Sequence, residues 1–410
     1  RNGGVWRTID GGLHWTKGIT IPAGDDLWVN AVVQDTRPGF RHIWYYGVFQ
    51  NSVKIGATIF KSIDGARTWK PVEASSGISY IHNLAVHPQS GNLYAAAYDG
   101  LHRFTAETDS VERVLYGGEF GEFTNVTITP AGVVYAGFDQ HYCEPTEGYE
   151  CPEQEAARGI LRSDDEVTWI NITPSELVYG PWAPYLYQWS QITIDYAPSN
   201  EHILYVVFNP DFNLEHALAF QYTDTASGEK WKPLTIPPYE MGLYHYWGMK
   251  SVVKVYPTNP DIVFFGASHN WSMNLYRSTN GFRDAGEIDF IGGYRQPFDT
   301  LAYPNHYPGQ HGLVFFHSNP NRALSLTDGG IYLTENILSD TVRWVSLNNS
   351  SYQVNAKQTD APKALPAEKV SPVYFTARWT SVENADHYIL DLSTDDFKTF
   401  VARFHNRLSK

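Results

Sequence analysis

Three acidic residues that lie among aromatic side chains are the first candidates for chemistry in this sequence: Asp26, Glu240 and Asp299. Glycosidic bonds are hydrolysed by two carboxyl groups about 5–9.5 Å apart, one acting as an acid and the other as a base or nucleophile. No motif singles out a pair. Further acids in similar segments are Asp25, Glu119, Glu122 and Asp211. Hydrolysis therefore stays an alternative, not the first choice.

The aromatic residues around these acids predict a recognition surface. The segment 237–250, "PPYEMGLYHYWGMK", has four large aromatics but no period of 2 or 3.6, so it fits neither a strand nor a helix. Two more segments, 175–189 and 291–311, are equally aromatic. Exposed apolar patches mark interaction sites, and Tyr and Trp dominate them, although long loops also use aromatics to fill small cores of their own. The predicted ligand-binding residues are Trp28, Trp182, Tyr185, Tyr187, Trp189, Tyr239, Tyr244, Tyr246, Trp247 and Tyr294.

An internal repeat predicts the elements that position these segments. A phrase of aliphatic, aromatic and basic residues followed by Ser or Thr recurs seven times, for example "GGVWRT" at 3–8, "ATIFKS" at 57–62 and "RGILRS" at 158–163. Two alternating, β-branched strands usually precede it, and a fourth strand follows near a Trp. Four short strands per repeat are typical of a propeller blade. We therefore predict an all-β fold, a seven-bladed β-propeller of four-stranded blades.

The turn between the third and fourth strands carries the most specific pattern. "TIDGGLHW" at 8–15 and "SIDGARTW" at 62–69 match the Asp-box, Ser/Thr-x-Asp-x-Gly-x-Thr-Trp, apart from His14 and Ala66, and "SDDEVTW" at 163–169 is one residue short. In such a turn the Asp caps the backbone and the Trp packs over it. We therefore expect structural roles for the following residues: Asp10, Trp15, Asp64, Trp69, Asp165 and Trp169.

With these turns the chain resembles the Asp-box propellers, a group that holds sialidases, xyloglucanase-type glycosidases and sortilin-like receptors. The resemblance covers roughly residues 1–350, and it leaves the activity open because the group mixes enzymes with binding proteins. In a propeller whose strands run a to d from the axis outward, the d–a and b–c loops share one face. The aromatic segments are d–a loops, so the resemblance gathers them on that face.

The C-terminal part follows a different pattern. Residues 1–355 are expected to form the propeller, 356–368 a linker, and 369–410 the start of a fibronectin type III-like β-sandwich. The sequence pattern of this part resembles that of secreted Bacteroidota proteins, and this resemblance implies export by type IX secretion. The first repeat opens at its third strand, so we expect its first two strands from sequence before Arg1 or from 350–356 and beyond.

Composition and charge limit the kinds of partner and cofactor that we expect. A net charge of −14 without a basic run argues against nucleic acid, which requires clustered cations. No apolar run approaches the roughly 18 residues of a membrane span. Cys143 and Cys151 predict a disulfide, with a metal site including His141, or free thiols, as alternatives. His245, His306 and His311 lack ligand spacing, so we expect no metal and no cofactor.

Together these observations predict a secreted or cell-surface binding module that recognises a glycan or a protein partner through the aromatic d–a/b–c face. A glycoside hydrolase that uses acids on the same face is the first alternative. A structural subunit of an extracellular assembly is the second.

Overall fold

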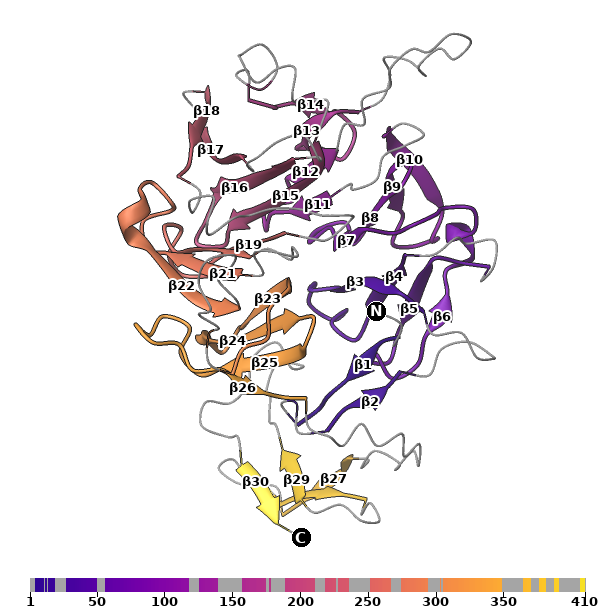
Figure 1. The fold of residues 1–410 in the computed structure, drawn as a ribbon. Helices are drawn as coiled ribbons and strands as arrows, with labels where there is room; N and C mark the ends of the chain where they lie inside the picture. The colour runs from indigo at the N-terminus through magenta and orange to yellow at the C-terminus, as the bar shows by residue number, and fades with distance from the viewer. Residues whose placement is uncertain are drawn as a thin grey trace. The chain divides into compact units, whose positions relative to one another are not determined.

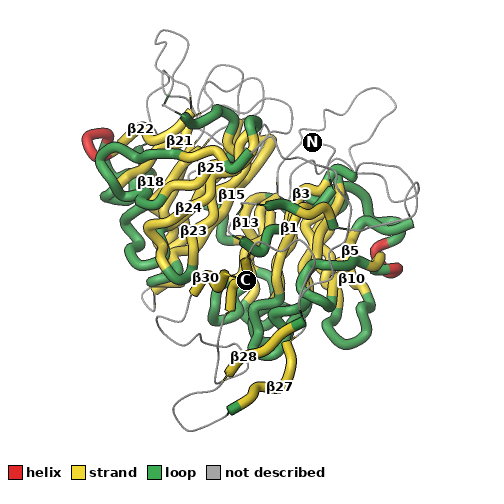
Figure 2. Tube along the Cα trace, turned by 90° about the horizontal axis from the view of Figure 1, so that it is seen from below, coloured by secondary structure: helices red, strands yellow, loops and turns green. Residues whose placement is uncertain are grey.

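The computed structural model describes the residues that carry most of the strand pattern. They are residues 4–10, 12, 14–18, 27–49, 56–117, 125–138, 157–174, 177, 189–210, 218–225, 228–235, 251–266, 274–293, 303, 305–348, 364–369, 376–380, 387–390 and 406–409. Within these ranges the regular structure is almost entirely strand, with short 3-10 turns at Glu73–Ser75 and Ala285–Glu287 (Figure 2). None of the described helical segments is long and apolar enough to cross a membrane.

Six antiparallel sheets of four consecutive strands each dominate the described residues (Figure 1). The first three are β3 (Val29–Gln34), β4 (Trp44–Val48), β5 (Ile59–Ser62) and β6 (Lys70–Pro71); β7 (Asn83–Val86), β8 (Leu93–Ala97), β9 (Gly100–Phe104) and β10 (Val111–Tyr116); and β11 (Asn125–Ile128), β12 (Val134–Phe138), β13 (Gly159–Ser163) and β14 (Ile170–Asn171). The other three are β15 (Trp189–Ala197), β16 (Asn200–Pro210), β17 (Leu218–Thr225) and β18 (Gly228–Pro233); β19 (Val252–Val255), β20 (Val263–Gly266), β21 (Asn274–Ser278) and β22 (Ile288–Gly293); and β23 (Gln310–Phe316), β24 (Asn319–Thr327), β25 (Gly330–Thr334) and β26 (Val345–Ser346).

The first strands of successive sheets contact one another, from β3 to β7 and on through β11, β15 and β19 to β23. Each sheet thus turns its first strand inward and its fourth strand outward, as Figure 1 shows. Radial four-stranded meanders of this kind define a β-propeller. The predicted all-β propeller and its a-to-d strand order are therefore confirmed.

The predicted number of seven blades is wrong for the described residues. The first copy of the repeat forms only β1 (Trp6–Arg7) and β2 (Thr16–Lys17), which pair in a two-stranded sheet. The reason is that the recurring phrase marks a third strand, so counting phrases counts this copy as a full blade. The segment 350–356, one of the two expected sources of the other strands, lies outside the described residues.

Packing on both sides explains the continuous apolar middle strands. In β16, the residues Leu204 to Phe208 are all essentially inaccessible, with side chains pointing alternately to two neighbouring sheets. One side joins the core with Tyr135 and Ile160, and the other joins the core with Val255 and Phe265. Each such side chain stabilises the fold by roughly 1.5–3 kcal/mol.

Tryptophans in the outer parts of the sheets fasten neighbouring sheets together. The Trp231 indole N–H donates to the carbonyl of Ile172 at 2.8 Å, and the Trp344 indole N–H donates to the carbonyl of Ile291 at 2.7 Å. Each bond reaches back to the preceding sheet. The Trp that recurs in the sequence is therefore an inter-sheet contact in these two repeats as well as apolar filling.

The C-terminal part forms two separate two-stranded sheets in its described residues. β27 (Ala364–Glu368) pairs with β28 (Thr376–Trp379), and β29 (His387–Leu390) pairs with β30 (Asn406–Ser409). The predicted fibronectin type III-like sandwich is not identified there, because two hairpins that are not paired to each other do not make its two multi-stranded sheets. The chain divides into two compact units, Arg1–Arg7 with Thr16–Asn348, and Thr8–Trp15 with Asn349–Lys410.

Candidate functional site

Most of the residues predicted to bind a ligand lie outside the described part of the chain. Trp28 is described in full, and it is 42% exposed just before β3. Trp189 begins β15, and its backbone alone is described. Outside the described residues lie Trp182, Tyr185, Tyr187, Tyr239, Tyr244, Tyr246, Trp247 and Tyr294, the acids Asp26, Glu240 and Asp299, and the cysteines Cys143 and Cys151.

The described part of the d–a/b–c face contains an aromatic row of Phe49, Tyr80 and Tyr98. The ring centroids are 5.0 Å apart between Phe49 and Tyr80, and 5.6 Å apart between Tyr80 and Tyr98. Phe49 and Tyr98 follow the second strands of two neighbouring sheets, and Tyr80 precedes the first strand of the second of them. Trp28 lies at the same end, where its carbonyl accepts the N–H of Phe49 at 2.8 Å.

Tyr80 occupies a backbone conformation that a large residue rarely adopts. Its φ is +52°, in the left-handed region, which costs on the order of 1 kcal/mol or more for a residue with a side chain. Ring contacts with Phe49 and with Tyr98 hold it in place. Such strain persists where the surroundings over-determine it, and it is common at ligand sites.

A charged cluster begins at the residue after Tyr98. One oxygen of Asp99 is 2.8 Å from His102 Nε2, and the other accepts from Arg113 Nη1 at 3.0 Å. The Arg113 guanidinium also lies 4.6 Å from the centroid of the Tyr116 ring. Burial alone would raise the pKa of Asp99, but the hydrogen bonds and charges of His102 and Arg113 outweigh it and lower this pKa. Asp99 is therefore an ionised acceptor and not a proton donor.

The carboxylates at the opposite end of the sheets are used within their own turns. Asp64 accepts the backbone N–H groups of Arg67 and Thr68, both at 3.0 Å, and the Thr68 hydroxyl at 2.6 Å. Burial of Asp64 opposes ionisation, but these bonds lower its pKa to about 2.

Asp165 repeats this arrangement. Backbone hydrogen bonds from Thr168 and Val167 lower its pKa to about 2. In the first repeat Asp10 accepts from the backbone N–H of His14 at 2.9 Å, and its second oxygen lies 2.6 Å from His14 Nδ1. In all three turns the carboxylate caps its own backbone.

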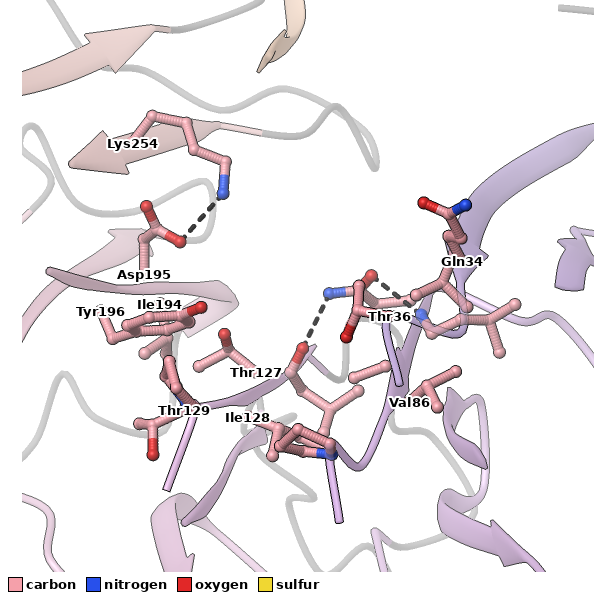
Figure 3. A pocket seen from close by; sticks show the side chains of 17 residues that line it. Gln34, Thr36, Val86, Thr127, Ile128, Thr129, Ile194, Asp195, Tyr196 and Lys254 are labelled. Atoms are coloured by element: carbon pink, nitrogen blue, oxygen red, sulfur yellow. Dashed lines mark hydrogen bonds and ion pairs between the residues drawn. The ribbon is translucent and has the colours of Figure 1, made fainter. Parts of the chain in front are cut away.

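A cavity of about 420 Å³ lies among the inner strands β3, β7, β11, β15 and β19 (Figure 3). Its one ion pair joins Lys254 Nζ to Asp195 at 2.9 Å, and the second Asp195 oxygen accepts the N–H of Val255 at 2.9 Å. Asp195 thus connects β15 to β19. The wall includes Gln34, Thr36 and Thr127.

No described group of three His, Cys, Asp or Glu residues could hold a metal ion. The described part of the site is therefore built from aromatic rings, hydroxyls and a small number of ion pairs. These groups can stack and hydrogen-bond.

Comparison with known proteins supports the fold. No family model matches the chain, and no curated protein matches it. Among solved structures, the GH74 enzyme of Niastella koreensis is similar with a TM-score of 0.57 at 16% identity, over 98% of this chain and 63% of that chain. An ancestral GH74 enzyme is similar with a TM-score of 0.53 at 14% identity, over 94% of this chain and 47% of that one. The chain spans less than two thirds of either structure.

At these identities the comparisons show the fold alone, a β-propeller of the kind found in GH74 enzymes.

Sequence reasoning missed two features of the site, the Asp99 cluster and the cavity. Asp99 and His102 stand in "DGLHRF" at 99–104, which was read only as a copy of the repeat. A signal was present there, because an Asp, a His and a Tyr adjoin a tight b–c turn.

Proposed function

We propose that this protein is a secreted or cell-surface module that binds a glycan on its d–a/b–c face. The observation that carries the proposal is the aromatic row of Phe49, Tyr80 and Tyr98 with the charged Asp99 and Arg113 beside it. Sugar rings have apolar faces that stack on aromatic rings. Their hydroxyl rims hydrogen-bond to carboxylate and guanidinium groups.

The electrostatics of Asp99, the acid beside the aromatic row, suit binding. The carboxyl groups with a resolved pKa shift all have lowered pKa values: Asp10, Asp64, Asp99, Asp165 and Glu166. A glycosidase needs one carboxylic acid with a raised pKa to protonate the leaving oxygen. Asp99 is thus ionised and can accept hydrogen bonds from sugar hydroxyls.

Glycoside hydrolysis is the second candidate. The observation in its favour is the fold shared with the two GH74 enzymes. Its acids would be Glu240, Asp299 or Asp26, on the same face. A subunit role in an extracellular assembly is the third candidate, in which another chain would cover the aromatic row.

Three finer assignments accompany the proposal. We infer that the turns at Asp10, Asp64 and Asp165 are Asp-boxes, since each carboxylate accepts backbone N–H groups within four residues. We also infer a fibronectin type III-like module after the propeller and export by type IX secretion. Both inferences rest on the sequence pattern of the C-terminal part. A Cys143–Cys151 disulfide would suit that extracellular location.

The experiment that tests the function is one incubation of the purified protein with a panel of insoluble polysaccharides. Retention on the polymer and released reducing ends are measured together. We expect retention without release. Trp28→Ala should abolish retention, whereas Phe40→Ala should not, because Phe40 is equally exposed (43% against 42%) but lies between β3 and β4, at the opposite end of the sheets.

Two outcomes would decide against the proposal. Release of reducing ends that Glu240→Gln abolishes would make the protein a hydrolase. Absence of both retention and release would favour a protein partner, to be sought by pull-down from the native cell surface.

A further inference from the structure

We propose that the cavity among the inner strands is a second binding site, specific for a small uncharged ligand rich in hydroxyl groups, such as one sugar unit. The site is separate from the aromatic row. Trp28 and Tyr80 precede the inner strands β3 and β7, whereas the cavity residues Thr36 and Pro88 follow them. The cavity extends along β7 from Asn83 to Pro88, and none of the residues of the aromatic row lines it.

The size of the cavity fits a small ligand. Its volume is about 420 Å³, and ligand pockets usually measure roughly 300–1,000 Å³. Five β-strands form its wall (Figure 3). The sheets behind them are packed on both sides. A wall built on such strands is largely pre-formed, so little ordering opposes binding.

The charges of the wall favour an uncharged ligand. The Asp195 side chain is 9% exposed, and its two oxygens are taken by Lys254 and by the N–H of Val255. A cation would therefore compete with Lys254 for this carboxylate. An anion would meet a lysine whose charge is already balanced, in a chain of net charge −14. An uncharged ligand avoids both costs.

The remaining groups of the wall suit hydroxyls. Thr36 and Thr127 each offer a hydroxyl that donates and accepts. The Gln34 amide nitrogen donates to the carbonyl of Arg41 at 2.6 Å. The amide oxygen of Gln34 is then the group that can accept a hydrogen bond from a ligand. The wall also includes the aliphatic side chains of Val86 and Ile128. Hydrogen-bonding groups combined with aliphatic ones match the rim and the faces of a sugar ring.

The contrasting interpretation is a solvent-filled channel in which Lys254 and Asp195 serve only to join β15 to β19. The two interpretations differ in what a plug does. In a solvent channel, filling the space changes no ligand binding. In a ligand site, it abolishes binding without touching the aromatic row.

The test uses the full 410-residue chain and a panel of methyl glycosides of neutral hexoses and pentoses, with binding measured by saturation-transfer NMR and calorimetry. The choice of sugars as probes rests on the proposed function. We expect saturable binding of at least one glycoside to the wild-type chain. Thr127→Trp, which fills the cavity, should abolish it when it is combined with Trp28→Ala, which removes binding at the aromatic row. The matched control Val111→Trp, at a 38% exposed position on the outer strand β10, should not.

Two further variants keep the result decisive. Thr127→Val removes one hydroxyl at nearly constant volume, so it keeps the proposal testable if Thr127→Trp fails to fold, and about 3- to 10-fold weaker binding is expected. Trp28→Ala should keep methyl glycoside binding while it loses polysaccharide retention, which separates failure of this site from failure of the aromatic row. The proposal is overturned if no glycoside binds the wild-type chain, or if both Thr127 variants bind as the wild type does.

Discussion

The two ends of the propeller use the same residue types for different purposes. At the c–d turns, an Asp such as Asp64 accepts hydrogen bonds from hydroxyl and backbone N–H groups within four residues. At the other end, Asp99 contacts His102 three residues on, accepts a hydrogen bond from Arg113 on β10, and adjoins an aromatic row. A carboxylate satisfied by its own turn stabilises a local structure. A carboxylate held between side chains at a surface can exchange one of them for a ligand.

The aromatic residues differ in the same way. Trp69 is 6% exposed and packs edge-on against Tyr46 at 4.7 Å, within a core beneath its turn. Trp28 is 42% exposed. The energy of burial is already realised for Trp69, whereas for Trp28 it remains to be gained on binding. The comparison thus predicts loss of stability at one end and loss of binding at the other.

The largest expected effect is on stability. Trp69→Ala should lower the free energy of unfolding by about 3–5 kcal/mol, because it removes a buried ring and leaves a cavity. Denaturant unfolding measures this loss. Polysaccharide retention of the folded fraction should stay at the wild-type level, and a variant that keeps its stability but loses retention would reverse the roles of the two ends.

The next effect is on binding. Tyr98→Ala should weaken polysaccharide affinity by about 10- to 100-fold, as expected for an aromatic anchor. Affinity electrophoresis in gels that contain the retained polysaccharide measures it. The control is Phe40→Ala, which should migrate as the wild type does. Equal retardation of the two variants would show that the aromatic row does not contact the glycan.

A smaller effect concerns acid stability. The pKa of Asp64 is about 2 in the folded protein, below its ordinary value of 3.8. Because the folded pKa is depressed, the stabilisation is fully present above about pH 4 and is lost as the pH falls toward 2. Asp64→Asn should lower the free energy of unfolding at pH 7 by about 1 kcal/mol, as loss of a backbone cap does.

Unfolding curves of both proteins between pH 2 and 7 provide the check. The difference in stability between wild type and Asp64→Asn should shrink as the pH falls. A constant difference over that range would mean that the charge of Asp64 does not stabilise its turn.

The smallest expected effect is at Arg113. Arg113→Leu removes a donor to Asp99 that also lowers the pKa of that carboxyl group. The change should weaken glycan binding about 2- to 5-fold, since the aromatic row remains. The binding should also become more sensitive to acid, because the pKa of Asp99 rises. An unchanged affinity at every pH would remove the charged cluster from the site.

Local patterns predicted much of the fold and little of the site. Strand alternation and the recurring phrase are local signals, so the four-strand unit and its a-to-d order followed from sequence. The number of blades did not, since "GGVWRT" at 3–8 looks the same whether or not two strands pair with it. The cavity brings Thr36 together with Lys254 across more than 200 residues, and no local pattern encodes such a distance.

Hydroxyl-radical footprinting of the wild-type chain tests the central claim most directly. The protein is labelled with and without the polysaccharide that retains it, and oxidation is read by mass spectrometry at Trp28, Tyr98 and Phe40. The account predicts that the glycan protects Trp28 and Tyr98 and leaves Phe40 unchanged. Protection of Phe40, with Trp28 and Tyr98 oxidised as before, would place the glycan at the wrong end of the propeller and contradict the account.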